Sequence, residues 1–472
     1  MQRQYSGDNG TGTLSKDLVS SLTSILSGTV ILPGSEQYES ARRVWNGMID
    51  KRPAIIARCA SVSDVVSAVK FAGENGLQAA VRGGGHNVSG FSTCDAGIVI
   101  DLSPMKGIRV DDARKEVYAQ AGLTWGEFDK ETQAHGLATP GGLISTTGIA
   151  GLTLGGGFGW LSRKYGLSCD NLLSADIVTA DGRFLTASLT EHQNLFWGIR
   201  GGGGNFGIVT AFRFRVHPLS SVFGSLVFHP YEDVRQTLKF FREFTRTCPE
   251  ELTSFAALLT APPLPFLPPA SHGQKLTLIA SCHCGPVEDA ERVLRPVRTS
   301  GRPVADLSSS QPYVAIQSAH DPTAPPGMRN YWKSEFVSEL PDDLIGALAS
   351  SMDSVLSPLN AIHIYHLQGA ISRVNDQATA YSHRDGRFLI LIIAMWTDSA
   401  DDEKEIQWAR GAWEKLRPFS LGGGYVNFLG DEGGERVKSS YSEATYGRLA
   451  ALKKTYDPSN FFRLNQNIPA GR

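Results

Sequence analysis

The stretch Val81-Arg82-Gly83-Gly84-Gly85-His86-Asn87-Val88-Ser89-Gly90 decides the fold of this chain. Three successive glycines can adopt positive φ angles and leave their N–H groups bare. Such a run can fold into a concave nest that binds an anion such as a diphosphate. A histidine directly after the nest would lie beside whatever the diphosphate carries. A Gly-rich turn with a surface histidine explains one such motif equally well, so the flanking sequence has to decide between the two interpretations.

The residues before the nest predict a βαβ unit. Residues 54–57 form a short apolar strand, and Ser61 followed three residues later by an acid is a typical helix start. Valines and alanine at helical spacing continue this helix until Asn75-Gly76 ends it. Residues 78–82 then form a strand that leads into the nest. Further strands are expected at 97–102 and 116–121, and a helix at 124–135.

Residues 139–160 form a second glycine-rich segment. Its many glycines and small hydroxyl side chains are incompatible with one continuous helix or strand. Ile144, Ile149, Leu152 and Leu154 make it too apolar for a flexible, solvated linker. We expect its backbone to lie flat against a large planar ligand.

A third glycine cluster contains a formal G-x-G-x-x-G at Gly202, Gly204 and Gly207. In a Rossmann fold this motif follows a strand and opens a helix. Here residues 208–216 follow it, and their β-branched and aromatic side chains predict a strand. We therefore predict that these glycines do not bind NAD.

Composition narrows the class of protein. The 472 residues suggest two or three domains, and a net charge of −2 without a basic run favours neither a nucleic-acid nor a membrane partner. Residues 1–27 lack the pattern of an export signal, no apolar run is long enough to span a bilayer, and the cytoplasm is the expected compartment.

Six cysteines do not suggest a disulfide framework. Cys282-His283-Cys284 lies in a strand-like stretch without a second pair at zinc-site spacing, so no metal site is predicted.

Glycine clusters become rarer after Pro218, which suggests three segments: 1–217, 218–417 and 418–472. The middle segment alternates predicted strands with predicted helices, as an α+β domain does. The strands are expected at 225–229, 276–284, 361–367 and 388–396, and the helices at 234–245 and 287–297. Glycines return at 422–424, and a last helix is stopped by Asp457-Pro458.

Taken in order, the motifs resemble those of the FAD-linked oxidases of the vanillyl-alcohol-oxidase superfamily. Within it the chain is similar to the berberine-bridge-enzyme branch, which includes 6-hydroxynicotine oxidase and bacterial sugar and antibiotic oxidases. The motifs lie at 82–90, 148–159, 164–166 with 170–171, 195–198 with 201–210, 425–428 and 465–468, so the resemblance covers nearly the whole chain. It implies an α+β fold in which a two-part FAD-binding domain, 1–217 and 418–472, carries an α+β substrate domain, 218–417, with an antiparallel sheet.

The resemblance also implies that FAD binds at the nest and is bonded through its 8α carbon to His86. Many members add a second bond from a cysteine, but here Ile144 occupies that position and Cys94 and Cys169 lie elsewhere. One covalent link is therefore expected. The implied cofactor-binding residues are Arg82, Gly83, Gly84, Gly85, His86, Asn87, Gly90, Thr146, Thr147, Gly148, Gly151, Leu152, Gly155, Gly156, Gly159, Gly207, Ile208, Val209, Tyr425, Asn427, Asn465 and Asn467.

The chemistry of such a site needs few protein groups, because the flavin itself accepts the hydride at N5. By analogy with the family, Tyr425 of the Tyr-x-Asn motif is the base that removes the substrate proton; a core tyrosine beside a glycine turn is the alternative. Free tyrosine titrates near pKa ~10, so the site would have to lower that value or the proton transfer be concerted. The substrate pocket is expected between the domains, and the candidates for its lining are Tyr331, Trp332, His366, Gln368 and Trp396.

The predicted function is an FAD oxidase that takes a hydride from an alcohol, an amine or a related C–H of a small organic substrate. That substrate is a sugar, an alkaloid or another secondary metabolite, and O2 is reduced to H2O2 at a face beside Thr147, whose side chain is small enough to admit it. Three alternatives remain: a dehydrogenase with another acceptor, a cyclase or pericyclase that retains FAD, and a flavin-binding protein without turnover. No particular oligomeric state is predicted.

Overall fold

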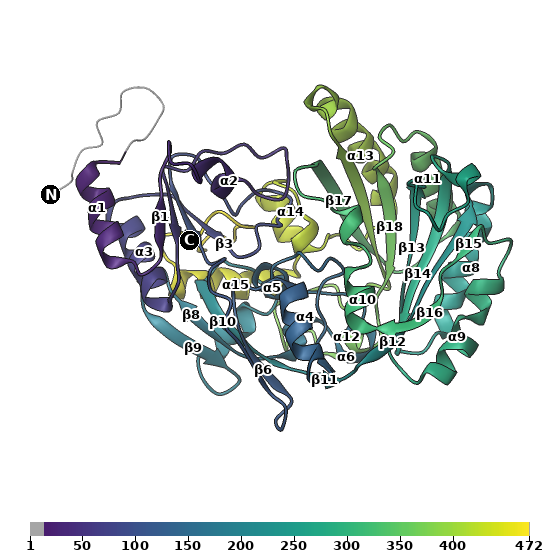
Figure 1. Cartoon of the computed structure of the whole chain (residues 1–472), viewed down its shortest axis with the longest axis horizontal. Helices are drawn as coiled ribbons and strands as arrows, with labels where there is room; N and C mark the ends of the chain where they lie inside the picture. Colours follow the sequence, from purple (N-terminus) through teal and green to yellow (C-terminus); the bar gives the residue numbers. More distant parts are fainter. Residues whose placement is uncertain (1–13, 472) are drawn as a thin grey trace.

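The chain folds into two α+β regions that lie side by side (Figure 1). The structure, a computed structural model, describes residues 14–471. The expectation that residues 1–27 hold no export signal therefore falls partly outside the described residues. Within the described range, no helix is long and apolar enough to cross a membrane.

The first region begins with the predicted βαβ unit, which is confirmed. Strands β2, β4 and β3 run parallel, and β1 is antiparallel to β2, in the order β1-β2-β4-β3. The Ser61 hydroxyl caps the intervening helix by accepting from the Asp64 N–H at 3.2 Å. Because β3 ends at Arg82, the glycine nest begins where a parallel strand stops. The bounds are α1 (Lys16–Ile25), β1 (Thr29–Ile31), α2 (Tyr38–Arg42), β2 (Ile55–Arg58), α3 (Val62–Glu74), β3 (Ala79–Arg82) and β4 (Ile98–Asp101).

A second, antiparallel sheet completes this region, in the order β5-β6-β10-β8-β9. Strand β10 follows Gly207 directly, which confirms that the G-x-G-x-x-G run opens a strand and not a helix. The bounds are β5 (Ile108–Asp111), β6 (Glu116–Gln120), α4 (Trp125–Gln133), β7 (Leu137–Ala138), α5 (Ile149–Leu154), α6 (Ser162–Tyr165), β8 (Leu172–Val178), β9 (Phe184–Ser188), α7 (Gln193–Gly198), β10 (Ile208–Arg215) and β11 (His217–Pro218).

The second region is built on an eight-stranded antiparallel sheet in the order β15-β12-β14-β13-β18-β19-β17, with β16 beside β12. The predicted α+β fold with an antiparallel sheet is confirmed. The sequence reading missed β13 and β17, the latter because Lys333 and Glu335 interrupt its apolar pattern. The strands are β12 (Ser221–Pro230), β13 (Leu252–Thr260), β14 (Lys275–His283), β15 (Ala305–Asp306), β16 (Ser309–Pro312), β17 (Arg329–Val337), β18 (Ala361–His366) and β19 (Phe388–Trp396).

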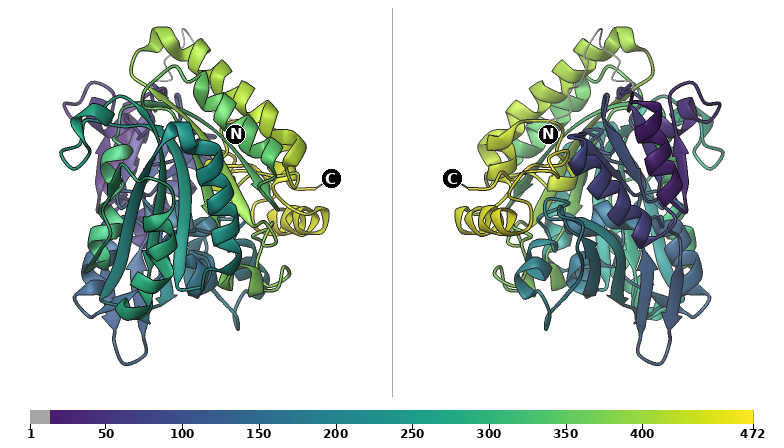
Figure 2. Two further views of the ribbon diagram at one scale, coloured as in Figure 1. Left: turned by 90° about the vertical axis from the view of Figure 1, so that its right-hand side faces the viewer. Right: turned by 90° about the vertical axis from the view of Figure 1, so that its left-hand side faces the viewer.

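The long helices α8, α9, α11 and α13 cover one face of this sheet. Figure 2 shows the long α13 in yellow-green along the outside of the strands. Because side chains alternate along a strand, Ile362, Ile364, Ile390 and Ile392 pack under the helices. The other face is turned toward the first region. The helices are α8 (Val234–Thr247), α9 (Val287–Thr299), α10 (Tyr313–Ser318), α11 (Asp342–Asp353), α12 (Ala370–Arg373) and α13 (Asp402–Leu416).

The C-terminal segment returns to the first region, where Figure 1 shows it in yellow among the purple and blue elements. Its helices are α14 (Gly434–Ser439) and α15 (Glu443–Tyr456), and Asp457 ends α15 as predicted. The fully buried ammonium of Lys453 donates to Asp457 Oδ2 at 2.7 Å, to the Asn205 carbonyl at 2.9 Å and to the Phe462 carbonyl at 2.8 Å. The bonds of Lys453 hold the C-terminal segment against the third glycine cluster, which contains Asn205.

Candidate active site

A cavity of about 1290 Å³ lies between the two regions. Pockets for drug-sized ligands usually measure about 300–1,000 Å³, so this one has room for a large ligand and a smaller one beside it. Glycine loops of the first region form one wall, which we call the backbone wall (residues 83–87, 142–154 and 202–209). The free face of the eight-stranded sheet forms the opposite one, which we call the sheet wall (cavity-facing residues of β12, β13, β14, β17, β18 and β19).

Two glycines explain the shape of the backbone wall. A Cβ added at Gly84 would lie 2.4 Å from the Gly148 nitrogen, and a Cβ at Gly148 would lie 2.5 Å from the Gly84 nitrogen. The nest and the second glycine segment therefore touch backbone to backbone. Gly85 has a φ of +66°, in the left-handed region that favours glycine. Among the described residues the N–H groups of Gly84 and Gly85 find no acceptor, which leaves them for an anion in the cavity.

His86 lines the cavity directly after the nest. Its ring stacks on Trp45 with centroids 4.4 Å apart and planes 18° apart. Its Nε2 atom is buried and has no hydrogen-bond partner among the described residues. Burial lowers the pKa of His86 to about 4, so the imidazole is neutral near pH 7. A buried, unpaired nitrogen is costly, and it marks a position where a ligand group is needed.

Tyr425 and Asn427 border the cavity next to the second glycine segment. The Tyr425 hydroxyl oxygen accepts from the Gly157 N–H at 2.8 Å and from the Asn427 amide at 2.7 Å. The same amide donates to the Leu152 carbonyl at 3.0 Å. Burial raises the pKa of Tyr425, although both hydrogen bonds act to lower it. The site alone does not lower this pKa, which was one of the two routes open to a tyrosine base.

Comparison with known proteins identifies the family. Residues 53–188 match the FAD binding domain model, and residues 424–469 match the berberine and berberine-like model. An FAD-linked oxidoreductase of Dictyostelium discoideum is 32% identical over 456 residues, 96% of each chain. This chain belongs to the berberine-bridge-enzyme-like branch of the vanillyl-alcohol-oxidase superfamily. It is an FAD-linked oxidoreductase.

Further relatives of this FAD-linked oxidoreductase support the assignment. (R)-6-hydroxynicotine oxidase of Paenarthrobacter nicotinovorans is 32% identical over 94% of this chain and 97% of its own length. The crystal structure of 6-hydroxy-D-nicotine oxidase from Arthrobacter nicotinovorans superimposes with a TM-score of 0.85 at 29% identity, covering 94% of this chain and 98% of that one. Xylooligosaccharide oxidase of Myceliophthora thermophila, at 22% identity, a TM-score of 0.85 and coverage of 96% and 99%, shares the fold.

The backbone wall of this FAD-linked oxidoreductase fits FAD. The unbonded N–H groups of the nest suit a diphosphate. The backbone contact between Gly84 and Gly148 leaves no room for a side chain between the two loops, and His86 presents an unpaired nitrogen. The predicted cofactor residues that line the cavity are Gly83, Gly84, Gly85, His86, Asn87, Thr147, Gly148, Gly151, Leu152, Gly207, Ile208, Val209, Tyr425, Asn427 and Asn465. Ile144 also lines it, whereas Cys94 and Cys169 are buried outside it.

The other predicted cofactor residues do not line the large cavity: Arg82, Gly90, Thr146, Gly155, Gly156, Gly159 and Asn467. Arg82 is buried and donates to the Ser92 carbonyl at 3.3 Å, so it supports the nest from behind. A Cβ at Gly155 would lie 2.1 Å from Asn427 Oδ1, which makes this glycine a contact of the Tyr-x-Asn motif.

Of the five candidates for the lining of the substrate pocket, only Trp332 borders the large cavity. Trp332 lines the cavity, but Tyr331, its neighbour in β17, points the other way and accepts from Arg410 Nε at 3.2 Å. Trp396 packs under the helices. His366 and Gln368 also lie outside the large cavity.

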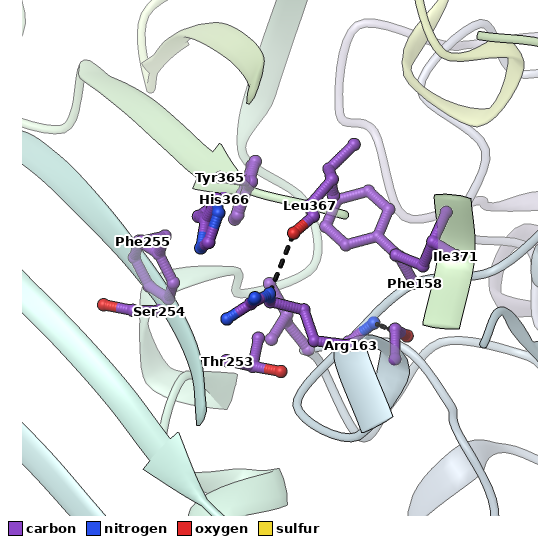
Figure 3. A pocket seen from close by; sticks show the side chains of 12 residues that line it. Phe158, Arg163, Thr253, Ser254, Phe255, Tyr365, His366, Leu367 and Ile371 are labelled. Atoms are coloured by element: carbon purple, nitrogen blue, oxygen red, sulfur yellow. Dashed lines mark hydrogen bonds between the residues drawn. The ribbon is translucent and has the colours of Figure 1, made fainter. Parts of the chain in front are cut away.

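Figure 3 shows where His366 lies instead, at a hollow of about 10 Å³ that has room for about one water molecule. Arg163 crosses this hollow and donates from Nε to the Leu367 carbonyl at 2.9 Å and from Nη1 to the Leu252 carbonyl at 2.6 Å. His366 Nδ1 lies 3.8 Å from Cys248 Sγ. Arg163 thus connects the ends of β13 and β18 to the first region.

Sequence reasoning missed the aromatic residues that bound the cavity: Trp45, Phe158, Phe255, His320, His363, Tyr365 and Phe428. The alternation of β18 placed His363 and Tyr365 on one face and His366 on the other, but it did not say which face meets the ligand. Trp45 carries no local signal, because its contact with His86 joins loops 41 residues apart in the sequence.

Proposed function

We propose that this FAD-linked oxidoreductase is an oxidase. A substrate carbon that bears a hydroxyl or amino group loses its hydrogen as a hydride, the hydroxyl or amine loses a proton, and a carbonyl or imine is formed. When bound, FAD supplies the hydride acceptor and passes the two electrons to O2, which leaves as H2O2. The observation that supports this is one continuous cavity bordered by His86, Thr147 and Tyr425.

We propose a single covalent bond between His86 and FAD. Two features of His86 support it: the buried Nε2 has no protein partner, and the lowered pKa keeps the ring neutral and therefore nucleophilic near pH 7. Ile144 stands where many relatives have a second bonding cysteine, and a branched alkyl side chain cannot form that bond. The thiols of Cys94 and Cys169 are buried away from the cavity, and burial raises both of their pKa values.

Tyr425 is the residue that we propose removes the substrate proton. As a phenolate it would accept the proton while the Gly157 N–H and the Asn427 amide stabilise its charge. Because burial raises its pKa, the phenolate is a minority form at neutral pH, and a concerted transfer reduces the charge that has to develop. Thr147 borders the same space with a small side chain, which leaves O2 room to approach.

An anaerobic screen tests the oxidase proposal. Alcohols, amines, sugars and polyphenols are mixed with the yellow protein in the absence of O2, and bleaching of the flavin absorbance is followed. We expect bleaching with at least one substrate, and one H2O2 per substrate once O2 is admitted. Bleaching without peroxide would identify a dehydrogenase, and a substrate converted without bleaching would identify a cyclase or pericyclase; either result contradicts the proposal.

A further inference from the structure

A continuous series of aromatic rings borders the cavity. Starting from His86, ring centroids are 4.4 Å apart to Trp45, 5.5 Å on to Trp332 and 5.6 Å on to Phe428. The series continues through Phe158, 5.7 Å from Phe428, to Tyr365 at 5.1 Å, Phe255 at 5.2 Å and His320 at 5.5 Å. All of these residues border the large cavity. Aromatic faces and edges of this kind pack favourably against another flat ring.

Charged side chains are missing from this lining. Of the described residues that border the cavity, none is Asp, Glu, Lys or Arg. The charged residues of β17 point away from it: Lys333 pairs with Glu432, and Glu335 pairs with Arg436 at 2.7 Å. A charged ligand group beside these rings would therefore lose its hydration without gaining an opposite charge. Moving an unpaired charge from water into such a site costs several kcal/mol.

The backbone of the sheet wall cannot replace the missing charges. Strands β13, β18 and β19 pair with neighbours on both sides, so their N–H and C=O groups are engaged in the ladders. The backbone wall differs, because its bare N–H groups can hold the diphosphate of FAD. Anion binding is thus confined to one wall of the cavity.

Neutral polar groups gather where the ring series ends, at Tyr365, His363 and His320. The Tyr365 hydroxyl and His363 Nδ1 are 2.7 Å apart. Burial raises the pKa of Tyr365, so its hydroxyl donates this bond, and a neutral His363 then carries its proton on Nε2. The nearby His320 has a buried Nε2 without a partner among the described residues, and its ring borders the cavity. A neutral imidazole with an unpaired nitrogen can donate a hydrogen bond to a ligand hydroxyl or accept one from it.

We propose that the substrate is an uncharged, flat aromatic compound that carries a hydroxyl group. Its rings lie between Trp332 and Phe255, and its hydroxyl meets the unpaired nitrogen of His320. This inference rests on the proposed function and narrows its substrate class: it excludes charged amines and carboxylates. It also excludes sugars, because their many hydroxyls need free polar partners, and the two amides that border the cavity here, Asn330 and Asn360, are already bonded to protein groups.

Binding of matched probes to the FAD-loaded protein tests this proposal without turnover. Isothermal titration calorimetry at pH 7 compares 2-naphthol, 2-naphthoate and 2-naphthylmethylammonium, which share one ring system and differ in charge, with the neutral sugar xylobiose. We expect 2-naphthol to bind at least about tenfold more tightly than each of the others, since every 1.4 kcal/mol is a factor of ten. Equal or tighter binding of either ion or of xylobiose overturns the proposal, and so does an absence of 2-naphthol binding.

Two variants locate the binding. His320→Phe keeps an aromatic side chain but removes both ring nitrogens, so 2-naphthol should bind about 2- to 10-fold more weakly while 2-methylnaphthalene is unaffected. Ile393→Lys adds a cation to the sheet wall and should favour 2-naphthoate over 2-naphthol. His366→Gln, on the opposite face of β18, is the matched control and should change neither. Unchanged preferences in both test variants would contradict the proposed position.

These results are independent of the oxidase proposal. If 2-naphthol binds as expected but no substrate bleaches the flavin, the proposed reaction is wrong and the binding preference stands. If the flavin is bleached by charged amines or by sugars, the reaction stands and the substrate class is wrong.

Discussion

The two walls of the cavity recognise their ligands by different means. The backbone wall uses main-chain groups, and its glycines at 84 and 148 leave no space for a methyl group between the loops. The sheet wall uses side chains, and every second residue of β13, β18 and β19 presents a ring or an alkyl group to the cavity. A wall made of backbone is sensitive to any added side chain, whereas a wall of side chains can change its chemistry without changing its shape. The first suits an invariant cofactor and the second a variable substrate.

The largest effect is expected from Gly84→Ala in the backbone wall. The new Cβ would lie 2.4 Å from the Gly148 nitrogen, so the nest and the second glycine segment must separate. We expect FAD content, measured as the ratio of flavin to protein absorbance, to fall to a small fraction of that of the parent. Gly73→Ala in α3, where an added Cβ meets nothing within 4 Å, is the control and should keep its flavin. A fully flavinylated Gly84→Ala would contradict the proposed role of the contact.

Tyr425 lies where the two walls meet, and Tyr425→Phe removes only its hydroxyl. Loss of general-base assistance commonly costs about 10²- to 10⁴-fold in rate, so anaerobic flavin reduction should slow by that factor while FAD content is retained. Because burial raises the pKa of Tyr425, the parent rate should rise with pH and reach no plateau below about pH 10. A variant that reduces its flavin as fast as the parent, or a parent rate without pH dependence, would assign the proton to another group.

A third test weakens the support of the backbone wall from behind. Lys453→Met leaves the buried carboxylate of Asp457 without its cation, and breaking a buried pair in this way costs about 3–5 kcal/mol. Chemical denaturation should show this loss in the free energy of unfolding. Lys454→Met changes the exposed neighbour and should have little effect. Equal stabilities of the two variants would mean that Lys453 does not fasten the C-terminal segment.

The smallest effect concerns the histidines on both walls. Burial lowers the pKa of His86 and of His320 to about 4 and that of His363 to about 3. The unfolded chain therefore binds protons that the folded chain does not, and stability should be lost as pH falls from about 6.5 toward 4, with no contribution from these groups above about 6.5. The melting temperature measured between pH 7 and pH 4 should fall, and His320→Phe should reduce the slope. A slope that the variant leaves unchanged would contradict the contribution of His320.

The backbone wall could be predicted from the sequence because its signals are local. Three glycines before His86, and a β-branched run after Gly207, fix what the backbone does within a few residues of each motif. The βαβ unit, the strand after the G-x-G-x-x-G run and the end of the last helix at Asp457 follow from the same kind of information.

The sheet wall could not be predicted in the same way. A strand pattern says which residues share a face, but the choice of the face that meets the ligand depends on packing with distant segments. Tyr365 and His366 are neighbours in β18, and only the helix layer beneath Ile362 and Ile364 shows that Tyr365 faces the cavity. Strand β17 was missed because the ion pairs that compensate its charged residues come from the C-terminal segment.

The covalent bond of FAD to His86 is the central claim, and the mass of the denatured protein tests it most directly. The intact chain should exceed its calculated mass by one FAD, and peptide mapping should find one flavin-bearing peptide, which contains His86. His86→Ala should have the mass of the chain alone. Flavin that remains entirely in the supernatant after acid precipitation of the unmutated protein, or a second flavin-bearing peptide containing Cys94 or Cys169, would contradict the account.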